Sequence, residues 1–142
     1  MNPYRKRLSS NFRRNENSAG YTLFLWFISG DTRLSESLKI IICDSNNEVY
    51  LSVVSIWEAI IKCSLGKLPL PEPPEIYLPK QRKLSNLINT LPVDGESVAQ
   101  LSTLSPFHRD PFDRMLVCKA LQHNLTIVTV DNAIRAYPVS VI

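Results

Sequence analysis

The sequence lacks the patterns that mark membrane proteins, secreted proteins and cysteine-bound metal sites. It contains no run of about 18 apolar residues, so no membrane-spanning helix is expected. The basic N-terminus is not followed by an apolar segment with a small-residue cleavage site, which argues against secretion. The three cysteines, Cys43, Cys63 and Cys118, form neither a CxxC pair nor a Cys/His zinc spacing. We therefore expect buried, reduced thiols in a cytoplasmic protein.

An excess of charge of one sign is also missing from most of the chain. Residues 1–20 carry five basic residues and one acidic residue, whereas the remainder carries 11 basic and 12 acidic residues. A short basic, polar segment is typical of a flexible arm, and it also suits contact with the phosphates of RNA. We predict such an arm over residues 1–19 and a single folded domain over residues 20–142.

Apolar patterning in that domain predicts strands that alternate with helices. The strand-like segments are 46–54, 90–94, 125–131 and 138–142. The helix-like segments are 21–30, 31–45, 55–67, 95–104, 110–124 and 132–137, with Ser35 and either Ser52 or Ser55 as helix caps and Gly30 and Gly66 at helix ends. This alternation predicts an α/β fold in which helices cover both faces of a central parallel sheet.

Acidic residues are placed where such a sheet binds ligands. Asp131 ends the clearest strand, Asp110 and Asp113 open a helix, and Glu58 lies in the helix that follows the strand 46–54. Ligands of parallel sheets bind outside the carboxyl ends of the strands, and all four side chains are expected at that edge. Because clustered carboxylates repel one another, a hard divalent ion such as Mg²⁺ or Mn²⁺ would stabilise them.

Two of these positions have a purely structural alternative. Asp110 is a suitable N-cap, Pro111 fits the first helical position, and Asp113 suits the positive end of the helix dipole. Glu58 is embedded in an apolar helix and needs a partner, for which Lys62, four residues later, is the simplest choice. The sequence leaves both interpretations open at this point.

Three segments of the chain resemble the signature segments of PIN-domain proteins, and the likeness is greatest to the VapC-like toxins of type II toxin–antitoxin systems. The segments are SVVSIWEAIIKCSLGKLPLP, LSPFHRDPFDRMLVCKAL and LTIVTVD. The resemblance implies a three-layer α/β/α domain with a central parallel sheet, and a Mg²⁺- or Mn²⁺-dependent endoribonuclease. It also implies an RNA substrate, a homodimer and a cognate antitoxin protein as partner.

The resemblance carries the acids of the family's site onto this chain one at a time. Glu58, Asp110 and Asp131 match its catalytic acids, and Asp113, close behind Asp110, is added to the metal ligands. The family also has a hydrophobic first strand that ends in a metal-binding Asp. Counting back from Phe24 places that Asp at Gly20, and the segment RRNENSA before it does not read as a core strand. The expected sheet therefore lacks its central first strand, and the expected site lacks one acid.

The residues around these acids have alternative roles. Arg109 and Arg114 are candidates either for phosphate contact or for ion pairs with the acids, and His108 for a general base. Phe107 and Phe112 are candidates for base stacking or for packing. Trp26 and Trp57 are expected in the core. Two functions remain: an active metal-dependent ribonuclease toxin, and a degenerate homologue that keeps only partner binding. No helix-turn-helix pattern supports a DNA-binding module.

Overall fold

A single parallel sheet runs through the molecule. The structure is a computed structural model of the whole chain, and it describes residues 7–10, 20–84, 88–129 and 131–142. The strands in these ranges lie in the order β3-β2-β1-β4-β5, and every neighbouring pair is parallel. They are β1 (Arg7–Ser10), β2 (Glu48–Ser52), β3 (Ile88–Leu91), β4 (Thr126–Val128) and β5 (Ser140–Val141).

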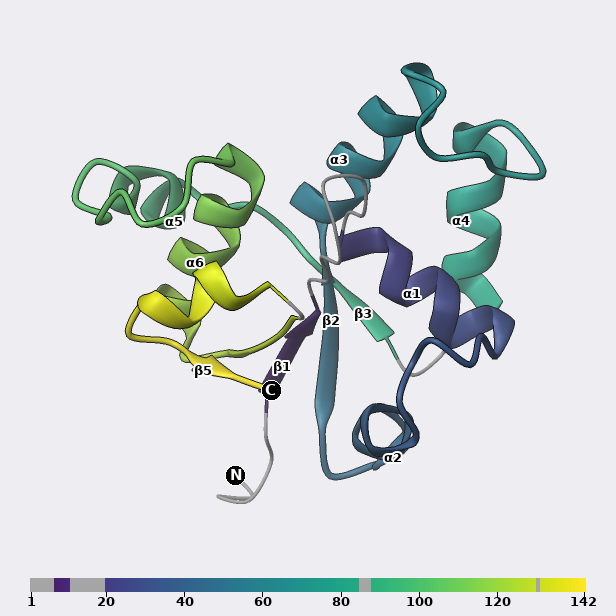
Figure 1. Cartoon of the computed structure of the whole chain (residues 1–142), viewed down its shortest axis with the longest axis horizontal. Helices are drawn as coiled ribbons and strands as arrows, with labels where there is room; N and C mark the ends of the chain where they lie inside the picture. The colour runs from purple at the N-terminus through teal and green to yellow at the C-terminus, as the bar shows by residue number, and fades with distance from the viewer. Residues whose placement is uncertain (1–6, 11–19, 85–87, 130) are drawn as a thin grey trace.

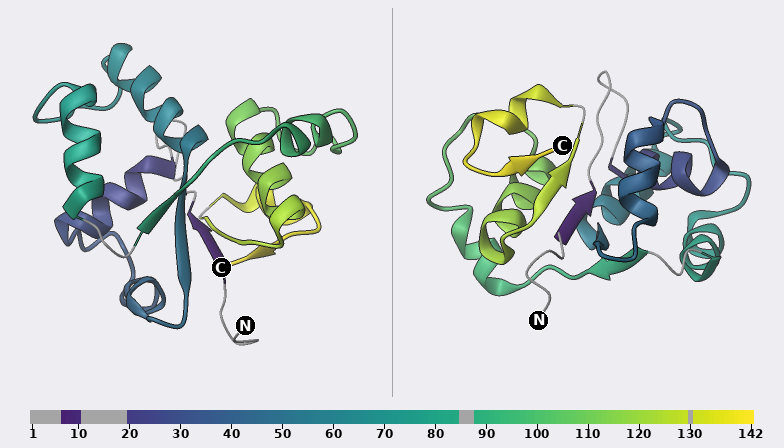
Figure 2. Two further views of the ribbon diagram at one scale, coloured as in Figure 1. Left: turned by 180° about the vertical axis from the view of Figure 1, so that it is seen from behind. Right: turned by 90° about the horizontal axis from the view of Figure 1, so that it is seen from below.

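Helices cover both faces of this sheet (Figures 1 and 2). One face carries α1 (Gly20–Ser29), α2 (Glu36–Cys43), α3 (Val53–Ser64) and α4 (Pro74–Leu84). The other face carries α5 (Gly95–Gln100), α6 (Pro111–His123) and the short 3₁₀ helix η1 (Asn132–Ala136). The predicted three-layer α/β/α fold with a central parallel sheet is confirmed.

The expectation that the sheet lacks its central first strand is wrong. β1 lies between β2 and β4, with Ser9 in register with both Tyr50 and Ile127. Its sequence, RLSS, has no alternating apolar pattern, but strands pair through backbone groups that every residue except proline provides. The rest of the predicted arm, residues 1–6 and 11–19, lies outside the described residues, and the boundary at residue 20 stays a prediction.

The strand order fixes where a ligand is expected. From β1 the chain moves outward to β2 and β3 on one side, and later to β4 and β5 on the other. The direction of winding therefore reverses between β1 and β4, and parallel sheets bind ligands at the carboxyl ends of the strands beside such a reversal. The segment that leaves β4 carries Asp131 to this edge.

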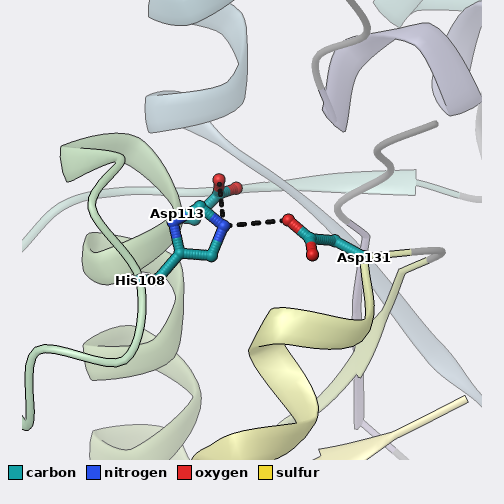
Figure 3. Close-up of side chains that lie close together, drawn as sticks. All are labelled: His108, Asp113 and Asp131. Carbon is teal, nitrogen blue, oxygen red and sulfur yellow. Dashed lines mark hydrogen bonds and ion pairs between the residues drawn. The ribbon is translucent and has the colours of Figure 1, made fainter. Parts of the chain in front are cut away.

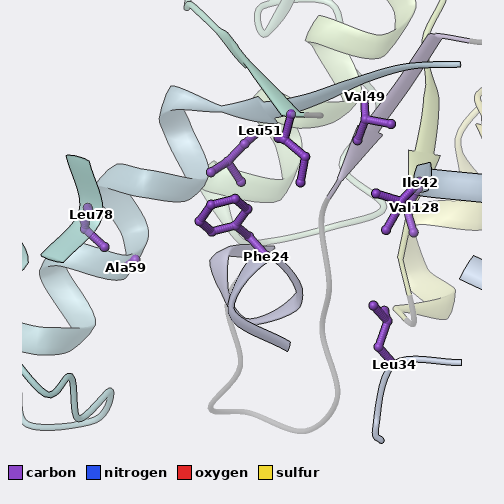
Figure 4. Close-up of a cluster of buried hydrophobic side chains, with 9 residues drawn as sticks. Phe24, Leu34, Ile42, Val49, Leu51, Ala59, Leu78 and Val128 are labelled. Atoms are coloured by element: carbon purple, nitrogen blue, oxygen red, sulfur yellow. The ribbon is translucent and has the colours of Figure 1, made fainter. Parts of the chain in front are cut away.

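Alternating side chains of the central strands supply two hydrophobic cores, one on each face. Val49 and Leu51 of β2 and Val128 of β4 face the layer of α1–α4, whereas Ile127 of β4 faces α6 and η1. Burial of both strand faces is the reason that these segments read as continuous apolar runs. Figure 4 shows the first core, which consists of Phe24, Leu34, Ile42, Val49, Leu51, Ala59, Leu78, Ile88 and Val128.

The helix ends follow the predicted chemistry. Ser35 and Ser52 cap α2 and α3, and Gly30 and Gly66 take the left-handed backbone conformation just beyond α1 and α3. The prediction of buried thiols is wrong for Cys43, which is exposed at the last residue of α2. Across the described ranges, no helix combines the length and the apolar character needed to cross a bilayer.

Candidate metal centre

Three side chains converge at the carboxyl edge of the sheet (Figure 3). His108 lies in the loop before α6, Asp113 in the first turn of α6, and Asp131 between β4 and η1. Each offers one ligand atom, and these atoms lie within 4.8 Å of one another. The fold thus brings together two of the predicted acids with a histidine that had been considered only as a general base.

Asp131 is held in place by the turn that starts η1. Its backbone N–H donates to Thr129 Oγ1 at 3.0 Å, and its Oδ1 accepts the N–H of Ala133 at 2.9 Å, so the residue is the N-cap of η1. The second carboxylate oxygen, Oδ2, is directed at His108 Nε2, 2.8 Å away. Because the capping contact uses Oδ1, the other oxygen, Oδ2, faces the cluster.

Asp113 is placed by the first turn of α6. Its side chain is fully buried, and its Oδ2 lies 3.2 Å from His108 Nε2. A buried carboxylate is costly without compensating charge, and the positive end of the α6 dipole supplies part of that compensation. The position of Asp113, at the carboxyl edge of a parallel sheet, is where ligands of such sheets bind.

His108 lies between the two acids and donates to Asp131. Its Nδ1 accepts the backbone N–H of Asp110 at 3.0 Å, so the proton of a neutral ring resides on Nε2. That Nε2–H is directed at Asp131 and lies close to Asp113. In this tautomer neither ring nitrogen presents a free lone pair, because Nδ1 accepts the Asp110 N–H and Nε2 carries the proton.

Asp110 acts as a helix cap. Its Oδ1 accepts the backbone N–H groups of Phe112 at 2.8 Å and of Asp113 at 3.3 Å. The capping interpretation is therefore confirmed. Asp110 does not belong to the three-residue cluster found among the described residues, and its role as a metal ligand stays a prediction.

Glu58 is buried in α3, and the Nζ of Lys62 lies 3.3 Å from its Oε1. This pair confirms the simplest partner predicted from the sequence. The Trp57 ring packs edge-on against Phe112 of α6 at 5.0 Å between ring centroids, which joins α3 to the helix that carries Asp113. The ligand role of Glu58 stays a prediction, whereas the expectation that Trp57 is a core residue is wrong, because 58% of it is exposed.

Sequence reasoning missed the residue that fixes the loop before α6. The hydroxyl of Tyr137 donates to the Ser105 carbonyl at 2.8 Å and accepts the His108 N–H at 2.9 Å. Arg114 donates to the carbonyls of Leu104 and Ser105, so it ties down the same loop through backbone acceptors. A tyrosine near the end of the chain gives no local signal of this contact, since its partners lie about 30 residues earlier.

The donor atoms of this cluster suit a divalent cation. Two carboxylates approach one point from different elements, and carboxylate oxygens are the ligands that Mg²⁺ and Mn²⁺ prefer. Asp113 and Asp131 therefore fit a metal, and His108 Nε2 forms a hydrogen bond with Asp131 Oδ2, one of the oxygens that such an ion would bind. No acid comes from β1, whose sequence is RLSS, and Gly20 is the first residue of α1.

Comparisons with known proteins identify the class. The family model of the PIN domain matches residues 22–139, and the chain therefore belongs to the PIN domain family. It is similar to ribonuclease VapC16 of Mycobacterium tuberculosis, with 42% identity over 45 residues, and the match spans 32% of this chain and 32% of that protein. A solved structure of FitAB bound to an IR36 DNA fragment shares the fold, with a TM-score of 0.53 and 18% identity over 96% of this chain and 93% of that one.

Proposed function

We propose that this protein is a metal-dependent endoribonuclease that hydrolyses phosphodiester bonds of RNA. The observation that carries the proposal is the convergence of Asp113, Asp131 and His108 at the carboxyl edge of the sheet, beside the reversal of strand order. Membership of the PIN domain family and the similarity to a protein named as a ribonuclease support the same conclusion.

Each residue of the centre has a defined task in this proposal. Asp113 and Asp131 would hold a Mg²⁺ or Mn²⁺ ion, with Glu58 as a further carboxylate from α3. The Nε2–H of His108 is directed at Asp131 Oδ2, where the ion would replace it, and Asp110 caps the helix that presents Asp113. When bound, such an ion polarises a phosphoryl oxygen and generates the attacking hydroxide.

We further propose that the protein is a cytoplasmic toxin of a type II system, which forms a homodimer and is held inactive by a cognate antitoxin. An apolar stripe on α3 supports a protein partner: Val53, Trp57 and Ile60 recur at helical spacing and are 39%, 58% and 44% exposed. Contiguous apolar surface of this kind is typical of protein–protein contacts.

A second candidate function is favoured by one observation. The site draws no acid from β1, and Gly20 stands where the family resemblance expects an aspartate. Loss of one ligand weakens metal binding strongly, and a chain with this defect would keep its partner-binding surface while cutting RNA slowly or not at all.

The decisive experiment compares Mn²⁺-dependent cleavage of a mixed RNA pool by the original chain and four variants. Asp113→Asn removes a carboxylate of the cluster, and Asp110→Asn, three residues earlier, is its matched control because asparagine also caps helices. We expect Asp113→Asn to abolish cleavage, and Asp110→Asn to keep most of it where that carboxylate serves only as a helix cap. Loss of cleavage in Asp110→Asn would instead establish its predicted role as a metal ligand. Asp131→Asn should behave as Asp113→Asn does, and Gly20→Asp should increase cleavage.

Each outcome decides between the candidates. Cleavage by the original chain that is lost in Asp113→Asn supports the active nuclease. Cleavage that appears only in Gly20→Asp supports the degenerate homologue, because it shows that the original chain lacks an acid that cleavage requires. Cleavage that survives in both Asp113→Asn and Asp131→Asn would refute the site altogether. Circular dichroism of every variant shows whether the fold is retained.

A further inference from the structure

In the loop before α6, the side chains of Phe107 and Arg109 are exposed to solvent, whereas that of His108 between them is directed into the molecule. Phe107 is 57% exposed and Arg109 is exposed, whereas the His108 side chain between them is only 9% exposed and faces the two aspartates. Consecutive Cα atoms are about 3.8 Å apart, so both exposed side chains start next to the metal centre. Their closeness to the centre follows from their adjacency to His108 in the chain.

This loop is fixed before any ligand arrives. Arg114 donates to the carbonyls of Leu104 and Ser105, and the Tyr137 hydroxyl binds both Ser105 and His108. The Phe107 ring rests edge-on against Tyr137, with 5.2 Å between ring centroids. A ring supported in this way stays accessible without a large loss of conformational freedom on binding.

Arg109 carries a positive charge that the described part of the chain does not neutralise. The guanidinium of Arg33 is paired with Asp31, and that of Arg114 is bound to backbone carbonyls. Within the described residues, no carboxylate forms an ion pair with Arg109 and no hydrogen bond engages its side chain. The result is an exposed cation next to a site that, in the proposed function, hydrolyses a phosphodiester.

We propose that Phe107 and Arg109 form the contact surface for a single-stranded RNA, with Arg109 on a phosphate beside the cleaved bond and Phe107 stacked on an adjacent base. This inference rests on the proposed ribonuclease function and specifies how the substrate is held. An aromatic ring combined with an unneutralised guanidinium suits a nucleic-acid strand, because each nucleotide offers a flat base and an anionic phosphate. The α3 stripe, by contrast, consists of apolar side chains.

The test measures binding without cleavage. The full chain is titrated into a fluorescein-labelled single-stranded oligoribonucleotide of mixed sequence in EDTA, and fluorescence anisotropy is read at several salt concentrations. We expect Arg109→Gln to weaken binding and to lower the slope of log K against log[salt] by about 0.7, the value of one phosphate contact on a single strand. Phe107→Ala should weaken binding about fivefold or more, while Phe107→Trp keeps it.

Two exposed positions elsewhere provide matched controls. Lys67→Gln removes one positive charge from the turn after α3, and Ile76→Ala truncates an apolar side chain that is 54% exposed on α4. Neither should change the affinity or the salt slope. Thermal melting of each variant identifies any loss of fold. Phe107→Leu keeps an apolar contact with Tyr137 but has no flat ring, so it should weaken RNA binding without loss of the fold.

The outcomes separate this inference from the function on which it rests. If the variants at 107 and 109 bind as the original chain does while Asp113→Asn loses cleavage, the contact surface is refuted and the nuclease stands. If the original chain neither binds nor cleaves RNA, both are refuted. If a variant at 107 or 109 changes the mass of the protein measured by light scattering but leaves its RNA affinity unchanged, the loop makes a protein contact. That result would overturn the proposal.

Discussion

A single imidazole stands between the two carboxylates of the centre (Figure 3). His108 donates through Nε2 because the N–H of Asp110 occupies Nδ1; its proton is directed at Asp131 Oδ2, and Asp113 Oδ2 lies 3.2 Å from the same nitrogen. Such a donor relieves the repulsion between like charges. A cation that binds both Oδ2 atoms must take the place of this hydrogen bond.

We therefore predict that His108→Ala binds Mn²⁺ about tenfold more tightly, since a hydrogen bond to a charged group is worth about 1.5–3 kcal/mol. Electron paramagnetic resonance of free Mn²⁺ during titration measures this directly. His123→Ala, which removes an imidazole bound to Asp94 instead, is the control. Weaker binding by His108→Ala would mean that the imidazole positions the acids for the metal.

Single residues differ in how well the sequence foretold them. The capping role of Asp110 and the place of Asp131 beyond a strand followed from local patterns. The tautomer of His108 did not, because it depends on one backbone N–H two residues later. Trp57 was misjudged because α3 carries apolar residues on most of its faces, so the pattern did not show which face is covered.

Between elements, one polar cluster joins α5 to α6 away from the metal centre. Lys119, almost fully buried on α6, forms an ion pair with Asp94, the N-cap of α5, and His123 also binds that carboxylate at 2.9 Å. The Lys119 ammonium, followed by the Ser97 N–H and His123, holds the pKa of Asp94 well below its ordinary value. The carboxylate is thus more stable as an anion in the folded chain than in the unfolded one.

The sign of the pH effect follows from that lowered pKa. The contribution of Asp94 is present in full above its unfolded pKa of about 3.9 and is lost as the pH falls towards the lower folded value. We expect Asp94→Asn to be less stable than the original chain at pH 7 and to lose less stability between pH 5 and pH 2. Urea unfolding across this range tests it, with Glu75→Gln, an exposed acid on α4, as control. Parallel pH profiles for the two chains would contradict the assignment.

At this scale the sequence predicted the apolar elements better than the polar ones. β2 and β4 were recognisable because both of their faces are buried in the two cores. β1 was not, since its four residues pair through the backbone and show no apolar alternation. β3 was expected over residues 90–94 and is found at Ile88–Leu91, a shift within the usual uncertainty of element ends.

Taken as a whole, the molecule has an uncovered apolar side along α3. Val53, Trp57 and Ile60 form its stripe, and Trp57 is the most exposed of the three. If this stripe is the dimer interface, dimer formation would bury a carboxylate placed in it without a partner. The free energy needed to bury that charge would prevent the dimer from forming.

We predict that the original chain is a dimer and that Trp57→Glu is a monomer. Light scattering coupled to gel filtration measures the mass of each. Ile76→Glu, which puts the same charge on an exposed apolar position of α4, should remain a dimer. An unchanged mass for Trp57→Glu would place the dimer contact elsewhere on the molecule.

The pairing of β1 has a consequence for how the chain is made. Leu8 is in register with Thr126, and Ser10 with Val128, so the middle of the sheet joins residues from nearly opposite ends of the sequence. Such contacts close a very long loop, which slows folding, and they form only after residue 128 has left the ribosome. Until then the strands β1 to β3 lack their neighbour β4, and Asp113 of α6 has no Asp131 opposite it. The centre is therefore completed only after the segment that carries Asp131 has been made, later than the strands β1 to β3.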